Sequence, residues 1–307
     1  MEVRVGAVLL DAAAPFDALG DVAGSARYAE RAGLDSLWAG DHLLLGENPL
    51  LDSTLTLAAA AAVTRTIAIG SAVFLPSLRP LAWAGRQVAT LAHLASGRLE
   101  LGVGAGAGPE QEYRAAGQQR RDRGQRTDEF LEALPRLLAG GPVTVGSGDD
   151  TATIRLRPVT PMPTVWIGGS SPAALRRTVR FGDGWLGALL TPVEFGRTRD
   201  RLRELPDAAG RPAPHLGLVT HAAIARTGHR SLEEAAAAVL RRSYGLSQEQ
   251  AERLAVAGAP AEVAHDLAEY VALGVEHLVV INDCTPWRQA CDLLRETRDG
   301  LAHISGT

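Results

Sequence analysis

The feature that most constrains the fold of this sequence is a regular alternation of short apolar segments with longer amphipathic ones. The short segments are nearly continuous runs of apolar residues, which is typical of strands in a sheet covered on both faces. Eight such segments occur, at 3–10, 35–41, 67–75, 99–104, 164–168, 184–190, 215–225 and 277–282. A helical pattern follows each of them, at about 18–32, 53–64, 80–95, 110–139, 172–181, 192–205, 231–273 and 286–302. The alternation predicts eight successive βα units.

Eight βα units in 307 residues predict a closed parallel (β/α)8 barrel, the TIM-barrel fold, as a single domain over 1–307. The alternative is an open doubly wound sheet. Its dinucleotide-binding glycines follow the first strand, whereas the run GVGAGAG at 102–108 follows the fourth. Two insertions interrupt the repeat. We expect a hairpin at about 141–158, around a Gly-Ser-Gly-Asp-Asp turn, and a helical insertion at about 231–260.

The amino-acid composition indicates which kinds of partner and chemistry this protein can have. A formal net charge of −4 without a basic stripe argues against nucleic acid and anionic membranes. No apolar run approaches the roughly 20 residues that span a bilayer. All 31 basic residues are arginine, which excludes a Schiff-base or P-loop lysine. The two thiols, Cys284 and Cys291, form neither a disulfide framework nor a zinc-site spacing. We expect a cytoplasmic, metal-free protein that binds a small molecule.

In a βα barrel, functional side chains lie where the strands end at the C-terminal mouth. The second strand, in SLWAGDHLLLG at 36–46, ends on Asp41 and His42. Because an imidazole titrates near neutral pH, His42 is a candidate proton donor or acceptor. The alternative is structural, with Asp41 capping a loop and His42 packing or facing solvent.

Two glycine-rich strand ends are candidate ligand sites. The first, GVGAGAG, lets a flat or anionic ligand approach the backbone. The second, VWIGGSSPAALRR at 165–177, combines a strand end, two glycines, two serines and a helix start. It resembles a phosphate cradle, although an ordinary capped helix start explains the same residues. The candidate cofactor-binding residues in these two segments are Gly104, Ala105, Gly106, Gly168, Gly169, Ser170 and Ser171.

Three further residues are candidates for a substrate pocket. Phe74, at the end of the third strand, and Trp38, on the second, offer apolar walls for a ring system. His221, on the seventh strand, is the third candidate. For each of them the alternative is packing within the core.

Three blocks of the sequence together resemble a known family. LWAGDH, IAIGSAVFLPSLRPLAWAGRQVATLAHLASGRLELGVGAG and VWIGGSSPAALRRTVRFGDGW, in this order and spacing, are similar to the bacterial luciferase-like superfamily of flavin and deazaflavin oxidoreductases. The similarity covers residues 1–190, and the C-terminal third only by architecture. The resemblance implies a TIM barrel with insertions, a reduced flavin or coenzyme F420 at the mouth, and a homodimer. The GDH strand end resembles the F420-dependent branch most.

The resemblance also implies roles for individual residues. Asp41 would contact the deazaflavin, and His42 would lie near the carbon that exchanges hydride. A non-prolyl cis peptide bond is implied at Ala72–Val73, where it forms a bulge behind the ring. The chain departs from family members that act on sugar phosphates, because Ala107 stands where they place a glutamate proton donor. Glu110 and Glu112 fall at a helix start, where stabilising the helix dipole is the simpler role.

These observations predict an F420-dependent oxidoreductase that transfers a hydride between C5 of the deazaflavin and a small organic substrate. His42 would move the accompanying proton, and Asp41 would orient the ring or the histidine. Ala72, Val73 and Gly104 would support the ring. One alternative is an FMNH2-dependent monooxygenase with FMN as the cofactor. Another is a catalytically silent barrel that binds a flavin-like ligand.

Overall fold

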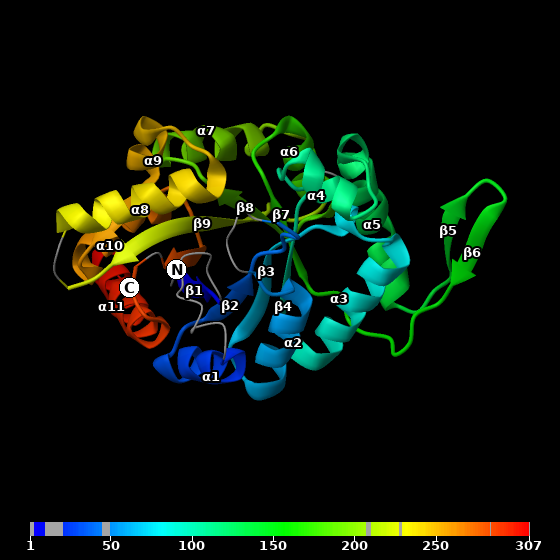
Figure 1. The fold of residues 1–307 in the computed structure, drawn as a ribbon, viewed down its shortest axis with the longest axis horizontal. Helices are drawn as coiled ribbons and strands as arrows, with labels where there is room; N and C mark the ends of the chain where they lie inside the picture. Colours follow the sequence, from blue (N-terminus) through cyan, green and yellow to red (C-terminus); the bar gives the residue numbers. More distant parts are fainter. Residues whose placement is uncertain are drawn as a thin grey trace.

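The chain folds into a closed barrel of eight parallel strands with helices on the outside (Figure 1). The computed structural model describes residues 3–9, 21–44, 50–206, 210–226, 229–282 and 284–306. The barrel strands are β1 Arg4–Val8, β2 Ser36–Ala39, β3 Ala68–Phe74, β4 Leu99–Val103, β7 Thr164–Gly168, β8 Gly184–Ala188, β9 His215–Ile224 and β11 His277–Asn282. The predicted (β/α)8 barrel is confirmed. Residue 10, predicted to end the first strand, lies outside the described residues.

Parallel pairing closes the barrel and brings all strand ends to one mouth. β1 pairs with β2 on one side and with β11 on the other. The ring closes where β8 pairs with β9, with Ala188 opposite Val219. A short strand, β10 Val256–Gly258, pairs with the carboxyl end of β9 at residues 222–224. Because every barrel pair is parallel, the residues that follow the strands gather at the same rim.

The helices lie between successive strands. They are α1 Val22–Ala32, α2 Ser53–Val63, η2 Pro76–Leu78, α3 Leu81–Ala95, α4 Glu110–Ala115, η3 Arg120–Asp122, α5 Arg123–Leu138, α6 Pro172–Phe181, α7 Pro192–Arg203, α8 His229–Tyr244, α9 Gln248–Leu254, α10 Pro260–Ala272 and α11 Trp287–Ser305. Local sequence explains several of their starts. Thr191 and Glu194 form a capping box at α7, and Asp52 accepts a hydrogen bond from the Leu55 N–H at the start of α2. In the described residues, no helix is long and apolar enough to cross a membrane.

An antiparallel hairpin, formed by β5 Val143–Ser147 and β6 Asp150–Ile154, projects from the barrel beside α3 and α5 (Figure 1). Its turn is at Gly148 and Asp149. The connection between β9 and β11 is also long, and contains α8, α9, β10 and α10.

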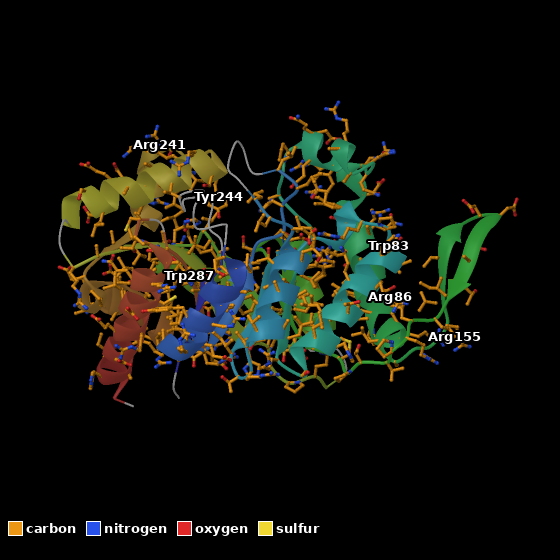
Figure 2. The ribbon with its side chains drawn as sticks, turned by 60° about the horizontal axis from the view of Figure 1, so that its bottom comes forward. Trp83, Arg86, Arg155, Arg241, Tyr244 and Trp287 are labelled. Atoms are coloured by element: carbon orange, nitrogen blue, oxygen red, sulfur yellow. The ribbon has the colours of Figure 1, made fainter. Side chains whose placement is uncertain are left out.

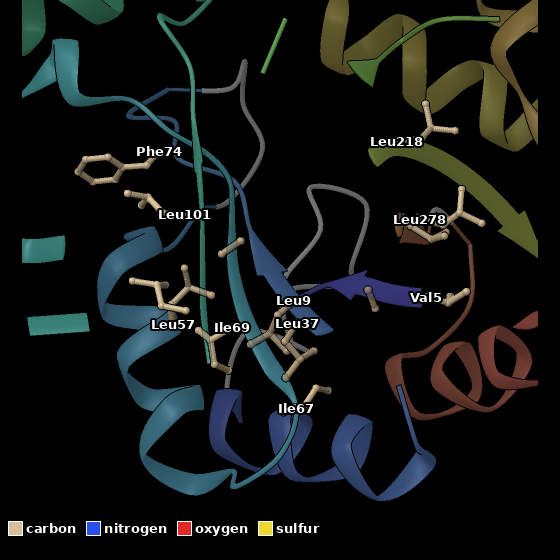
Figure 3. Close-up of a cluster of buried hydrophobic side chains, with 14 of the residues drawn as sticks. Val5, Leu9, Leu37, Leu57, Ile67, Ile69, Phe74, Leu101, Leu218 and Leu278 are labelled. Carbon is tan, nitrogen blue, oxygen red and sulfur yellow. The ribbon is translucent and has the colours of Figure 1, made fainter. Parts of the chain in front are cut away.

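The main core fills the layer between the barrel wall and the helices. Val5, Leu37, Ile69 and Leu57 are fully buried there (Figure 3). Burying an aliphatic side chain of this size stabilises a fold by about 1.5–3 kcal/mol. This layer holds the strands in register and thereby fixes the positions of their ends.

A second, smaller core fills the inside of the barrel. Trp38 and Trp166 are buried there with Val8, Leu186 and Val279. The space for Trp38 is provided by a glycine on the neighbouring strand, because a Cβ built on Gly70 would lie 2.3 Å from the indole. Trp38, a candidate for the substrate pocket, is thus fully buried inside the barrel.

Polar groups cross the inside of the barrel close to this core. The Trp166 indole N–H donates to Glu100, 3.0 Å away, and an Arg4 guanidinium nitrogen lies 2.6 Å from the same carboxylate. The Nδ1 atom of His277 lies 3.3 Å from Glu100, and its Nε2 atom lies 2.7 Å from the Ser36 hydroxyl. Burial opposes ionisation of Glu100. The contacts with His277 and Arg4 outweigh it and hold the pKa of this carboxyl below its ordinary value.

Candidate active site at the mouth of the barrel

Asp41 is a buried anchor at the end of β2. Its side chain is only 5% exposed, and both carboxylate oxygens accept hydrogen bonds. The Arg79 guanidinium donates two, at 2.6 and 2.7 Å. The Ser53 hydroxyl and the Leu75 backbone N–H donate the others, at 2.7 and 2.8 Å. Bidentate arginine–carboxylate pairs of this kind are strong and fix orientation.

The Asp41 contacts join three segments of the mouth: the end of β2, the first residue of α2, and the loop after β3. Arg79 also lies over the ring of Phe74, with its guanidinium carbon 4.7 Å from the ring centroid. Phe74, another candidate for the substrate pocket, is 1% exposed and packs against Phe130 in the layer under the helices. Asp41 therefore holds the base of the His42 loop in place.

The predicted non-prolyl cis peptide bond at Ala72–Val73 is present. The register of β3 against β4 shifts at this point, between Ser71 and Phe74. Glycines at the carboxyl ends of β4 and β7 make room for the bulge. A Cβ built on Gly104 would lie 2.5 Å from a γ-methyl of Val73, and one on Gly168 would lie 2.9 Å from the other γ-methyl. Side chains at these two positions would displace Val73.

The bulge faces a cleft at the mouth. The cleft is lined largely by apolar side chains, among them Leu9, Leu50, Leu51, Ala72 and Ile281. Its ionisable lining side chains in the described residues are His42, His221 and Tyr244. The structure therefore brings His42, His221 and the bulge to one cavity. Trp38 and Phe74 do not line it.

His221 and Tyr244 form a pair on the side of the cleft formed by β9 and α8. The His221 Nε2 atom lies 2.9 Å from the Tyr244 hydroxyl, and the two rings meet edge to face. Tyr244 lies on the side of α8 that faces the barrel, whereas Arg241 points outward (Figure 2) and donates to Gln248. The pair places two hydrogen-bonding groups in the cleft.

The two glycine-rich strand ends lie on the other flank of the bulge, and the cleft lining does not include them. Gly169 has a φ of +105°, a conformation that favours glycine. Ser170 and Ser171 are exposed, and the Ser171 hydroxyl accepts from the Ala174 N–H at the start of α6. The helix start therefore presents glycine backbone and serine hydroxyls to solvent.

The loop that follows β4, at 104–106, is held in place by hydrogen bonds to its backbone carbonyls. The Ala105 carbonyl accepts hydrogen bonds from the Tyr113 and Ser77 hydroxyls, at 2.8 and 3.2 Å. Gly106 has a φ of +82°, and its carbonyl accepts a bond from Arg123. These contacts keep the backbone of 104–106 beside the Val73 bulge.

Glu112 is a site residue that the sequence interpretation missed. The sequence places it at a helix start, where a role at the helix dipole is the simpler prediction, but its side chain is fully buried and contacts the His42 loop. It accepts hydrogen bonds from the backbone N–H groups of Leu43 and Leu44, at 2.8 and 3.3 Å. Its Oε1 atom lies 3.6 Å from Nδ1 of His42.

In the described residues, no group of three or more His, Cys, Asp or Glu side chains is arranged to hold a metal ion.

The mouth of the parallel barrel thus combines the β3 bulge, His42 and a helix start with exposed glycine and serine residues. The sequence model of the luciferase-like monooxygenase family matches residues 4–277. The chain therefore belongs to this family.

Individual relatives divide between two chemistries. An F420-dependent glucose-6-phosphate dehydrogenase of Intrasporangium calvum is 31% identical over 294 residues, which are 82% of this chain and 85% of that protein. A 4-hydroxyprotoasukamycin monooxygenase of Streptomyces nodosus subsp. asukaensis is 31% identical over 203 residues, which cover 57% of this chain and 54% of that one. The chain spans 61% of the length of the first curated relatives that it matches.

The fold is shared with solved structures. An F420-dependent secondary alcohol dehydrogenase, solved with an F420-acetone adduct, superposes with a TM-score of 0.80 over 98% of this chain and 99% of that one. The two sequences are only 18% identical, so this likeness concerns the fold.

Proposed function

We propose that this protein is an F420-dependent oxidoreductase that transfers a hydride between the deazaflavin and a small organic substrate. The observation that carries the proposal is that His42 and Ala72, which belongs to the β3 bulge, line one cleft at the barrel mouth. The similarity to an F420-dependent dehydrogenase over most of both chains supports the choice of cofactor.

The residues present fit a planar ring that carries a phosphate chain. The Val73 bulge, seated in its cradle of glycines, offers a flat apolar support beside the cleft. The segment Gly168–Ser171 would bind the phosphate, since a helix N-terminus with exposed glycine and serine groups suits an anion. The bound deazaflavin supplies the hydride chemistry, while His42 would hold and move the accompanying proton at its imidazole.

Asp41 would act mainly through the segments that it joins. Both of its oxygens are already engaged by Arg79, Ser53 and Leu75. We propose that it fixes the backbone that carries His42 and the loop that follows the bulge. Its predicted contact with the deazaflavin stays a prediction.

We further propose that the substrate is an uncharged carbonyl compound or alcohol. The described residues that line the cleft include neither arginine nor a carboxylate, and the chain has no lysine. A phosphorylated substrate would therefore find no permanently charged cation among the described lining residues, which makes its desolvation costly. His221 and Tyr244 would hydrogen-bond the substrate oxygen.

Titration of the purified protein with F420 and separately with FMN tests the cofactor. We expect saturable F420 binding followed by fluorescence, and hydride exchange with neutral ketones or alcohols that His42→Ala abolishes. FMN binding without F420 binding would overturn the proposal. Unchanged turnover in His42→Ala would refute the proton-transfer role of His42, and cofactor binding without any turnover would favour a silent flavin-binding barrel.

The glycine cradle offers a matched pair of variants. In Gly104→Ala, the new methyl group meets Val73, so we expect F420 affinity to fall at least about 10-fold, which corresponds to about 1.4 kcal/mol. In Gly104→Ala combined with Val73→Ala, the clash is relieved and part of the affinity should return. Equal loss in both proteins would contradict the proposed support of the ring.

An FMNH2-dependent monooxygenase is the second candidate. The family to which the chain belongs and the similarity to a monooxygenase favour it. Incorporation of labelled O2 into product in the presence of reduced FMN would establish this activity and displace the first proposal.

We propose a second copy of the chain as the protein partner. Leu55 on α2 is 72% exposed and Trp83 on α3 is 66% exposed, and Trp83 projects from the helix (Figure 2). The Gln87 amide contacts Thr54, 3.5 Å away, which places these helix segments side by side. Large exposed apolar groups on neighbouring helices favour an interface. Sedimentation should show a dimer that Trp83→Arg dissociates, and a monomeric wild-type protein would contradict it.

A further inference from the structure

The sequence and the comparisons assign no role at the mouth to Glu112, yet this side chain is the most deeply buried carboxylate there. It comes from α4, after β4, and its exposed fraction is 0%. Its Oε1 atom accepts hydrogen bonds from Leu43 and Leu44, in the loop after β2. Glu112 therefore connects the two loops that carry the proposed catalytic histidine and the proposed support of the ring.

Two buried polar atoms at this place have no hydrogen-bond partner in the described residues. They are Nδ1 of His42 and Oε2 of Glu112, and both are shielded from solvent. The other carboxylate oxygen, Oε1, lies 3.6 Å from Nδ1. This separation exceeds a hydrogen bond by only about 0.5 Å. Such bonds are often long in a free enzyme and tighten when ligands bind.

The surroundings favour closing this contact. A buried carboxylate is costly unless it is paired and hydrogen-bonded. In the part of the chain that the structure describes, His42 is the basic side chain within 4 Å of Glu112. His42 lines the cleft, and its side chain is 31% exposed although its Nδ1 atom is buried. The buried Nδ1 edge of the ring thus faces a carboxylate oxygen, while part of the side chain remains open to solvent.

We propose that Glu112 is a positioning residue that holds the proton of neutral His42 on Nδ1. The lone pair of Nε2 is then directed to the cleft, where it would take up or return the proton that accompanies hydride transfer. A carboxylate that orients a histidine through its second nitrogen is a general device of active sites. This role in catalysis rests on the proposed function, whereas the proton position on His42 does not.

The test uses the cofactor-free protein with 15N-labelled histidine. Proton-coupled 15N NMR, at a pH at which the imidazole is neutral, reports which nitrogen of His42 carries the proton. His42→Gln identifies its signals among those of the eight histidines. We expect an Nδ1-protonated ring in the wild type. An Nε2-protonated ring, the form that free histidine prefers in water, would overturn the proposal without any variant.

Two variants that each replace a glutamate of α4 by glutamine, Glu112→Gln and Glu110→Gln, complete the test. Glu112→Gln keeps an acceptor for Leu43 and Leu44 but removes the charge, so we expect His42 to shift to Nε2 protonation. Glu110→Gln, an exposed position two residues earlier on α4, should leave the spectrum unchanged. An unchanged spectrum in Glu112→Gln would refute the role of the carboxylate.

A kinetic readout separates this role from mere support of the loop. With F420 bound, Glu112→Gln should lower kcat about 10- to 100-fold, a share of what general acid–base catalysis contributes, and should leave the F420 dissociation constant near that of the wild type. If the cofactor does not bind at all, the proposed function fails, but the NMR result still decides the role of Glu112. Loss of cofactor affinity with unchanged kcat would reduce Glu112 to a loop support.

Discussion

The variant Asp41→Asn tests the anchor beneath the mouth most directly. Asparagine has the shape of aspartate, but an NH2 group replaces one of the oxygens that the Arg79 guanidinium and its neighbours donate to. The substitution removes the charge of a pair in which Asp41 is 5% and Arg79 is 17% exposed. The new NH2 group would also face a hydrogen-bond donor of Arg79, Ser53 or Leu75, so that one hydrogen bond is replaced by a repulsive donor–donor contact.

The magnitude follows from this burial. Removing one partner of a buried ion pair costs about 3–5 kcal/mol. We expect the lower end, about 3 kcal/mol, because the partly exposed Arg79 regains some hydration. For 307 residues, an unfolding entropy of about 2.1 cal/mol/K per residue gives about 0.64 kcal/mol/K in total. The Tm should therefore fall by about 5 °C.

Scanning calorimetry of Asp41→Asn, Arg79→Gln and the double variant measures the effect. The double variant should lose less than the sum of the two single losses, by about 0.5–3 kcal/mol. Asp149→Asn, at the exposed hairpin turn, is the control, and should stay within about 0.5 kcal/mol of the wild type. An Asp41→Asn protein as stable as the wild type, or strictly additive losses, would refute the reasoning.

Two further predictions concern groups away from the cleft. Burial raises the pKa of the Cys291 thiol to about 12, and only a thiolate attacks disulfide reagents. The native protein should therefore release one equivalent from such a reagent quickly, from exposed Cys284, and Cys284→Ser should abolish this release. The pKa of Glu100 lies below its ordinary value of 4.5, because contacts with His277 and Arg4 outweigh burial. Its contribution to stability is thus complete above that value and is lost as the pH falls through the lower pKa of the folded state. The Tm of Glu100→Gln should consequently depend less on pH under acidic conditions than that of the wild type.

Sequence patterns predicted the barrel because its determinants are local and periodic. Each apolar strand with its following helix is a unit that can be recognised in isolation. The strand ends at Asp41, Gly104 and Gly168 could be placed at the mouth for the same reason. The cis peptide bond at Ala72–Val73 was predicted from the family resemblance, and the structure contains it.

The direction in which barrel side chains point could not be predicted in this way. Successive residues of a strand face opposite sides of the sheet, but both faces of this sheet are apolar, so the sequence does not alternate. Trp38 and Phe74 were candidates for the substrate pocket because they are aromatic and lie on or at the end of barrel strands. The structure places Trp38 inside the barrel and Phe74 under the helices, next to Phe130.

The sequence by itself determined the number of βα units, the location of the glycine-rich strand ends, and the presence of an acid and an imidazole after the second strand. Tertiary structure alone decided which groups those residues meet. Asp41 is engaged by Arg79, 38 positions away, and Glu112 by the loop at 43–44, nearly 70 positions away. A hydrogen bond between distant segments depends on how the ring closes and where its loops fold back, and no local pattern encodes that.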